Sequence, residues 1–341
     1  ANWSPDFPTA AQQALKFYHD EKPADPAFDG VIAVTPTFIS HLLELTGPIT
    51  VSGIKFDKDN LVETLQYQVE VAYAQQGISD ANRKEIIGGL SQQLFTRLLT
   101  MPQDRWSTMW SILERDVAAK QVLMYASQTE EEQFITDLGW DGALKATDGD
   151  YLMVVDANLA SLKSDPAVKH SIAYSVARDG NDLTAHLTIT YNNTGQFNWK
   201  STRYRSFVRV YVPKGSVLKT ATGYMQDDKL HGGKPAQPTT EEDLGKTVFA
   251  GFIAIEPQEQ GTLDLIYALP NGISTLFAGG SYTLLMQKQG GTQAYDLALD
   301  INATGKVQSY APQQEATLRG TTVHDSTTLA EDRSFSVTFR P

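Results

Sequence analysis

The residues best suited to bind a ligand lie in one segment, residues 194–205, with the sequence TGQFNWKSTRYR. Aromatic and basic side chains alternate there, although the whole chain carries a net charge of −12. Aromatic faces stack on sugar rings, and cations bind phosphates or carboxylates. We therefore predict a ligand-binding loop. Its predicted binding residues are Phe197, Trp199, Lys200, Arg203 and Arg205. The alternative is a hairpin end whose aromatics pack on the protein and whose cations balance nearby acids.

A second group of polar residues surrounds a predicted strand at residues 151–156. Asp148, Asp150, Asp156 and Asn158 offer hard oxygen ligands, which suit Ca²⁺. Their spacing does not fit an EF-hand, and turn residues beside a strand explain them equally well. Asp156 and Asn158 fall at the end of the strand, where α/β sheets often place a site. The alternative is that they cap the junction between two domains.

The chain lacks the motifs of several classes of enzyme. None of the six histidines lies three or four residues from another, and the chain has no cysteine. There is no H-E-x-x-H, no G-x-S-x-G and no Walker loop, so zinc protease, triad hydrolase and P-loop nucleotidase chemistry lack support. We predict no metal and no cofactor.

Composition limits the partners. The pI of about 4.9 and the net charge of −12 argue against binding to nucleic acid or to anionic membranes, because both need a positive field. No apolar run approaches the roughly 18 residues of a membrane helix, so we expect no membrane contact from this chain itself. The chain begins at Ala1 without Met, and we expect any membrane anchor to lie upstream.

The element that organises the first part of the chain is residues 29–51, DGVIAVTPTFISHLLELTGPITV. Residues 31–34 form an apolar strand pattern, Thr35 and Pro36 suit the start of a helix, and Gly47 ends it before a second strand at 49–51. Further helical patterns follow, and Trp106 and Trp110 in one of them are predicted to face the core. Strands alternating with helices predict an α/β domain with some parallel pairing over residues 1–165.

The period of the pattern changes after Pro166. Residues 183–191 alternate apolar and polar side chains, and about eight such strands follow without a clear helix. The polar segments 225–244 and 303–332 are predicted to be long loops. Residues 166–341 are therefore predicted to form an all-β antiparallel sandwich of immunoglobulin-like type.

Three stretches resemble a known family. Residues 29–51, 155–165 (VDANLASLKSD) and 204–218 (YRSFVRVYVPKGSVL) together resemble large bacterial envelope proteins known only as domain of unknown function 4012, matching that family's C-terminal part. The resemblance implies an extracytoplasmic, cell-surface protein that is membrane-anchored in its full-length form.

A second resemblance concerns the helical region. The strand–helix–strand unit, followed by a helix pattern from Arg83 to Arg97, is similar to the LytR–CpsA–Psr phosphotransferases, which join lipid-linked glycopolymers to the cell wall. It implies an alternative site at Asp29, Arg83 and Arg97, where arginines grip a pyrophosphate. Two arginines fourteen residues apart on one helix would lie roughly 21 Å apart, too far to share one pyrophosphate.

Two functions follow. The first is a non-enzymatic envelope module that binds cell-wall glycan or an envelope protein. The alternative is a phosphotransferase of the LytR–CpsA–Psr type. The chain shows no compact catalytic constellation, which favours the first.

Overall fold

The structure is a computed structural model that describes residues 2–24, 27–80, 82–313 and 316–340. It divides into two compact units, Ala1–Ala143 and Leu144–Pro341. The division comes earlier than the predicted boundary at 165/166, because strand β5 (Asp150–Asn158) pairs with strands of the second unit. Within the described ranges, no helix is long and apolar enough to cross a membrane.

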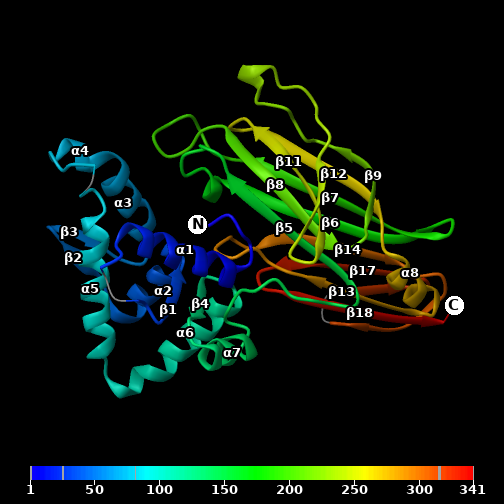
Figure 1. Ribbon diagram of the computed structural model, residues 1–341, viewed down its shortest axis with the longest axis horizontal. Helices are drawn as coiled ribbons and strands as arrows, with labels where there is room; N and C mark the ends of the chain where they lie inside the picture. The colour runs from blue at the N-terminus through cyan, green and yellow to red at the C-terminus, as the bar shows by residue number, and fades with distance from the viewer. Residues whose placement is uncertain (1, 25–26, 81, 314–315, 341) are drawn as a thin grey trace. The chain divides into compact units, whose positions relative to one another are not determined.

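The N-terminal unit is mainly helical (Figure 1). Its helices are α1 (Phe7–Glu21), α2 (Pro36–Thr46), α3 (Leu61–Tyr67), the π-helical turn η1 (Gln68–Ala72), α4 (Tyr73–Gln75), α5 (Glu85–Leu99), the 3-10 turn η2 (Gln103–Arg105), α6 (Trp106–Ala118) and α7 (Thr129–Asp137). Its strands are β1 (Gly30–Val34), β2 (Ile49–Val51), β3 (Ile54–Phe56) and β4 (Val122–Ala126).

The predicted strand–helix–strand at residues 29–51 is confirmed as β1, α2 and β2. The Thr35 hydroxyl accepts the backbone N–H of Phe38 at 3.3 Å, which satisfies one of the donors left open at a helix start. At the other end, Gly47 adopts a φ of +81° and donates its N–H to the carbonyl of Leu43. A left-handed backbone favours glycine here, so the cap ends the helix as the sequence indicates.

The expected parallel pairing in this unit is wrong. β1 pairs with β4 in antiparallel fashion, and β2 pairs with β3 as an antiparallel hairpin. The turn Ser52–Gly53 lets the chain fold back at once, so the second strand never returns alongside the first. The described pairings therefore give two small two-stranded sheets instead of a parallel α/β sheet.

The core of the N-terminal unit forms where α2, α5 and the β2–β3 hairpin meet. Phe38, Leu42, Leu90 and Leu94 are buried there, as their helical spacing predicts. The prediction that Trp106 and Trp110 face the core is wrong, because about half of each side chain is exposed. The buried end of α6 is its last turn, at Asp116 and Val117, whereas both tryptophans lie in its first half.

The C-terminal unit contains two seven-stranded, mostly antiparallel sheets (Figure 1). The first sheet has the order β10 (Thr239–Asp243), β11 (Lys246–Ile255), β8 (Tyr204–Pro213), β5, β13 (Ser281–Met286), β18 (Arg333–Arg340) and β15 (Lys306–Ala311). The second has the order β16 (Ala316–Arg319), β17 (Thr322–Leu329), β14 (Tyr295–Asn302), β6 (Val168–Asp179), β7 (Asp182–Asn193), β12 (Gln260–Ala268) and β9 (Val217–Thr222).

The alternating pattern of residues 183–191 is confirmed in β7. Leu183, Leu187 and Ile189 are buried, whereas Thr184 and Thr188 between them are partly exposed. Residues of opposite parity point to opposite faces of a strand, so β7 covers a core on one side only. The parallel pairings of the described chain lie in this unit instead, between β13 and β5 and between β14 and β6.

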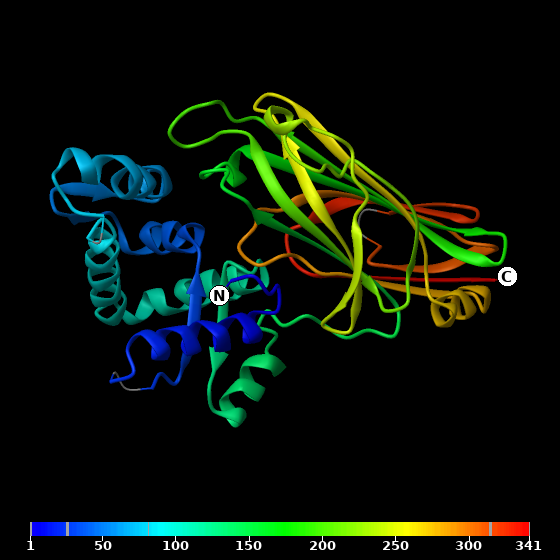
Figure 2. The ribbon, with the colours of Figure 1, turned by 45° about the horizontal axis from the view of Figure 1, so that its top comes forward.

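Two predictions about this unit are corrected. The segment 303–332 is not a long loop, since it contains β15, β16 and β17. Its strands carry many exposed polar side chains, and only single residues such as Val323 face inward, so the apolar signal is weak. The unit also contains a helix, α8 (Asn271–Ala278), drawn as a coil in Figure 2. The ring of Phe277 on this helix lies 4.9 Å from the ring of Phe339.

One hydrophobic cluster takes residues from both sheets. Val154, Val208 and Val210 come from the first sheet, and Leu187 and Leu299 come from the second. Burying apolar surface contributes roughly 25 cal/mol per Å², so this shared cluster is the main source of stability for the unit. It also fixes the strand ends from which the candidate site is built.

Candidate functional site

The predicted loop connects β7 to β8, and backbone hydrogen bonds hold its tip. The Asn198 carboxamide accepts the N–H groups of Lys200 and Ser201, each at 2.8 Å. The Ser201 hydroxyl donates to the Gln196 carbonyl at 2.7 Å. These contacts close a tight turn at residues 196–201, so the side chains at the tip are presented from an ordered backbone.

Polar side chains below the tip tie the base of the loop to the end of β11 in the first sheet and to the segment that follows β11. The Asn193 amide donates to the carbonyl of Ile255, and its oxygen accepts the N–H of Gly195 at 3.0 Å. The Gln258 amide donates to the carbonyls of Thr194 and Gly195, each at 2.8 Å. Asn193 is fully buried, so its bonds are shielded from water.

The aromatic residues of the loop face solvent. Phe197 is 65% exposed and Trp199 is 39% exposed, which are large values for residues of this size. Lys200 lies between them and the strand, and its carbonyl accepts the N–H of Lys163 at 2.9 Å. The structure therefore places the two predicted aromatic residues at the surface, where a flat ring could reach them.

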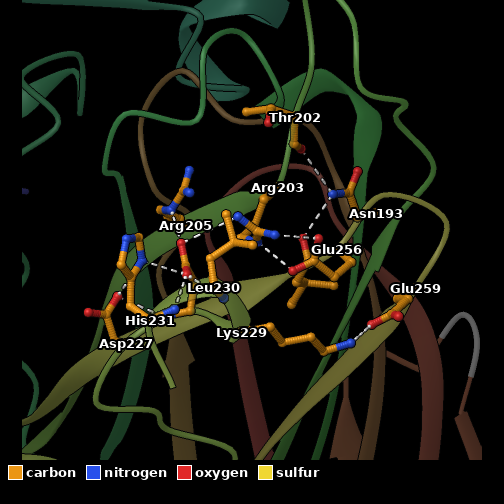
Figure 3. Close-up of polar contacts among 12 residues, drawn as sticks. Asn193, Thr202, Arg203, Arg205, Asp227, Lys229, Leu230, His231, Glu256 and Glu259 are labelled. Atoms are coloured by element: carbon orange, nitrogen blue, oxygen red, sulfur yellow. Dashed lines mark hydrogen bonds and ion pairs between the residues drawn. The ribbon is translucent and has the colours of Figure 1, made fainter. Parts of the chain in front are cut away.

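The arginines of the loop are placed differently. Arg203 is only 6% exposed and donates twice to the carboxylate of Glu256, once through Nε and once through Nη2 at 2.9 Å. Figure 3 shows Arg203 turned toward Glu256 and Lys229 turned toward Glu259. The Nη1 atom of Arg203 also lies 3.4 Å from the carboxylate of Asp228. Two-pronged pairing of this kind fixes both position and orientation.

Asp228 joins the second arginine to the same network. Its Oδ2 accepts the Nε–H of Arg205 at 2.7 Å, and its Oδ1 accepts the N–H of Leu230 and lies 2.8 Å from His231 Nδ1. Burial alone would raise the pKa of Asp228. Hydrogen bonds from Arg205 and His231, with the charges of Arg203 and Arg205, outweigh burial and hold that pKa well below its usual range.

Ligand binding by Arg203 and Arg205 stays a prediction, although the contacts agree with the alternative in which the cations of the loop balance nearby acids. Both guanidiniums are already paired with carboxylates of the protein itself. Glu256 and Asp228 are 53 and 25 positions from Arg203 in the sequence, so no local pattern indicates the pairing. Three residues in this network, Glu256, Asp228 and His231, were absent from the prediction.

Asp227, Asp228 and His231 place three atoms that could ligate a metal within 4.8 Å of one another. Arg203 and Arg205 lie against the same Asp228 carboxylate, and a divalent cation there would face two positive charges. The Asp228 side chain also caps the short 3-10 turn Lys229–His231, because it accepts the backbone N–H groups of Leu230 and His231. These contacts explain the cluster as a cap and an ion pair.

The alternative phosphotransferase residues do not share a partner. Arg83 lies before the start of α5, and it pairs with Glu70 at 3.3 Å. Arg97 donates to the carbonyls of Thr46 and Gly47 at 3.1 and 2.9 Å, where it stabilises the C-terminal end of α2. Asp29 is exposed, and its carbonyl accepts the N–H of Ser127. Helix capping and a local ion pair thus explain both arginines.

Asp156 and Asn158 lie at the end of β5, as predicted. The Asn158 amide donates to Asp165 at 2.6 Å, and its oxygen accepts the N–H of Ser161. These bonds shape the turn after the strand. Asp156 points between the two sheets, where its Oδ1 accepts the hydroxyls of Tyr191 and Ser206, each at 3.1 Å.

Asp150 lies on the same face of β5 and is fully buried. The hydroxyls of Tyr174 and Tyr282 donate to its Oδ2, each at 2.6 Å, and its Oδ1 accepts the N–H of Tyr151. Burial raises the pKa of Asp150 to about 6, although the three hydrogen bonds oppose that rise. Asp150 is therefore held inside the core, and this position does not suit the calcium ligand that its sequence context allowed.

A shallow groove of about 580 Å³ runs over the outer face of the second sheet. Its floor is made by small residues of β6 and β14, including Ala173 and Ala298. Hydroxyl side chains of β7 and β17, such as Thr188 and Ser326, form its sides. No predicted site residue lines it.

Comparisons with known proteins give limited guidance. No curated protein matches this chain. Among solved structures, a "putative nutrient binding protein" from Legionella pneumophila subsp. pneumophila str. Philadelphia 1 is 8% identical, with a TM-score of 0.31 over 56% of this chain and 72% of that one. Leukotriene A4 hydrolase from Saccharomyces cerevisiae is also 8% identical, with a TM-score of 0.30 over 53% of this chain and 30% of that one. Likenesses this weak support no argument about function.

A family model provides the remaining match. It covers the predicted family segment at 29–51 but does not extend to the segments at 155–165 and 204–218. The N-terminal part of this chain, residues 1–69, thus matches the family described as "Protein of unknown function (DUF4012)".

Proposed function

We propose that this protein is a non-enzymatic module of the bacterial cell envelope, on the outer side of the membrane, which binds glycan through Phe197 and Trp199. The observation that carries the proposal is the exposure of two aromatic residues on a loop whose backbone is tied down. Aromatic faces that are ordered before binding lose little conformational entropy when a ring stacks on them. The resemblance to envelope proteins supports the location.

The charges around the loop indicate what kind of glycan would bind. Arg203, Arg205 and Lys229 are each paired with a carboxylate, from Glu256, Asp228 or Glu259. These cations already have protein partners, so they contribute little attraction for a phosphate or an acidic sugar. The proposed ligand is therefore a neutral saccharide that stacks on the aromatic rings, as in the sugar backbone of a cell wall.

The two sheets would serve as the scaffold for this loop. We infer that they lie face to face as a sandwich, and the hydrophobic cluster shared by both sheets supports this arrangement. The loop joins β7 of one sheet to β8 of the other, so its base is held from both sides. Rigid strands that carry a binding loop are a common way to position ligand contacts.

The proposal can be tested by sedimentation of the full chain with insoluble cell-wall glycan. Phe197→Ala and Trp199→Ala should each reduce the fraction of protein that sediments, because each removes a stacking face. Phe134→Ala is a matched control, since Phe134 is 64% exposed but lies on α7 in the other unit. It should leave the bound fraction unchanged.

Two outcomes would contradict the proposal. Equal sedimentation of all three variants and the wild type would show that the aromatic loop does not contact the glycan. A reduction that is matched by loss of the folded state, measured by circular dichroism, would show that the loop residues act on stability only.

A further inference from the structure

Asp156 presents one carboxylate oxygen that makes no hydrogen bond within the described part of the chain. Its Oδ1 is bonded to Tyr191 and Ser206, whereas its Oδ2 is buried without a partner. The backbone of the same residue is fixed on both sides, because Gln289 accepts its N–H at 2.9 Å and donates to its carbonyl at 3.0 Å. The carboxylate therefore cannot move to find a partner without breaking these bonds.

Among the buried polar atoms on the facing sheet that have no hydrogen bond in the described residues, two share an aromatic cluster with Tyr191. They are Nε2 of His170 on β6 and the hydroxyl of Tyr295 on β14, and Tyr295 is only 4% exposed. The His170 ring lies 4.7 Å from the ring of Tyr295 and 4.7 Å from that of Tyr191. Tyr191 donates to Asp156, so His170 and Tyr295 belong to the same aromatic cluster as a direct partner of the Asp156 carboxylate.

Electrostatics agree with this proximity. Burial raises the pKa of Asp156 and lowers that of His170, while each group acts on the other in the opposite direction. Burial raises the pKa of Tyr295, and the charge of Asp156 raises it further. Burial therefore favours uncharged forms of the acid and the imidazole, and both can still donate or accept a hydrogen bond.

Asp150 provides an internal comparison, because it lies on the same strand and the same side of it. Both of its oxygens have partners, from Tyr174, Tyr282 and the backbone of Tyr151. Leaving a buried polar group unbonded costs about 1–3 kcal/mol, so native proteins normally satisfy such groups. Three unbonded atoms around Asp156 thus need a common explanation that Asp150 does not.

We propose that Asp156 Oδ2, His170 Nε2 and the Tyr295 hydroxyl bind one buried water molecule between the two sheets. A buried water typically makes about three hydrogen bonds to groups that otherwise lack partners, which is the number available here. A calcium ion would need six to eight oxygen ligands, and Asp156 offers the single free carboxylate oxygen of this group. The water would link β5 of one sheet to β6 and β14 of the other.

The test is a crystal structure of the full chain at a resolution that shows ordered water, with melting curves of matched variants. We expect one density peak within hydrogen-bond distance of all three atoms. Tyr295→Phe removes one bond to this water, and should lower the Tm by about 2–4 °C. The double variant Asp156→Leu with His170→Leu should remove the peak.

Three results would overturn the proposal. One is a direct hydrogen bond between Asp156 and His170, with no density between them. Another is a Tm that rises with added ZnCl₂ or CaCl₂ and falls with EDTA, together with anomalous scattering at the site, which would identify a cation instead. The third is a Tyr295→Phe protein whose Tm equals that of the wild type and whose density is unchanged.

Discussion

The two halves of the segment 194–205 have opposite environments. Phe197 is mostly exposed and Trp199 is partly exposed, whereas Arg203 is buried and paired with Glu256 and Asp228. In the sequence they form one mixed cluster that suggests a single site for a charged, ring-containing ligand. The structure separates them, because strand β8 begins at Tyr204 and draws the arginines toward the body of the unit. Neighbouring residues in the sequence can therefore have opposite environments in the fold.

Replacing Arg203 should have the largest effect on stability. Arg203→Met keeps the apolar stem but leaves Glu256 without its bidentate partner in a mostly buried place, and should lower the free energy of unfolding by about 3–5 kcal/mol. Urea denaturation measures this. Lys214→Met breaks the exposed ion pair with Glu242 in the same unit, and should change the free energy by less than about 1 kcal/mol. Equal effects of the two variants would show that the Arg203 network is not structural.

The pH dependence of Asp150 provides a contrast with the arginine-paired acids. Its pKa is raised from 3.8 to about 6 in the folded protein, so the folded state binds a proton more tightly than the unfolded state. Protonated Asp150 therefore stabilises the fold. This stabilisation is complete below pH 3.8 and is lost as the pH rises through about 6. The loss should amount to about 3 kcal/mol, and Asp150→Asn should remove it. An unchanged pH profile in Asp150→Asn would contradict the raised pKa.

Asp228 should show the opposite sign. Its pKa is depressed below the ordinary 3.8 in the folded protein, so it stabilises the fold above that pH. This stabilisation should be lost as the pH falls below 3.8 toward the folded value. Denaturation curves of Asp228→Asn should show a less stable protein at neutral pH and a weaker dependence on acid. A variant as stable as the wild type at pH 7 would show that the ion pairs of Asp228 do not stabilise the fold.

The smallest effect on stability is expected for Phe197→Ala. An exposed side chain that contributes little packing typically changes the free energy of unfolding by less than about 0.5 kcal/mol. The same denaturation experiment used for Arg203→Met measures it. A loss close to that of Arg203→Met would mean that both halves of the segment hold the fold together.

Local features of the fold could be predicted from the sequence, and long-range ones could not. Thr35, Pro36 and Gly47 marked α2 correctly, because capping depends on neighbours in the chain. The alternation of β7 was also visible. Parallel pairing was assigned to the wrong unit, since strand direction depends on partners far away in the sequence. The strands at 306–329 were missed because their exposed faces carry mostly polar residues.

The same division applies to the candidate site. The aromatic residues Phe197 and Trp199 were predicted as binding residues from their types alone, and the structure leaves both partly exposed, which does not test that prediction. The role of Arg203 depended on Glu256, which no spacing rule connects to it. His170 and Tyr295 gave no signal either, because each is a single residue in an ordinary strand pattern. The role proposed for them depends on packing between the two sheets, which no local pattern indicates.

The affinity of the full chain for a soluble, neutral fragment of cell-wall glycan, measured by isothermal titration calorimetry, tests the central claim most directly. The double variant Phe197→Ala with Trp199→Ala should bind at least about fivefold more weakly, since two stacking faces of roughly 0.5–1.5 kcal/mol each are lost. Raising the salt from about 0.05 to 0.5 M should leave the wild-type Kd within about twofold, because screening acts on charges and not on stacked rings. An unchanged Kd in the double variant, or wild-type binding that disappears at high salt, would contradict the account.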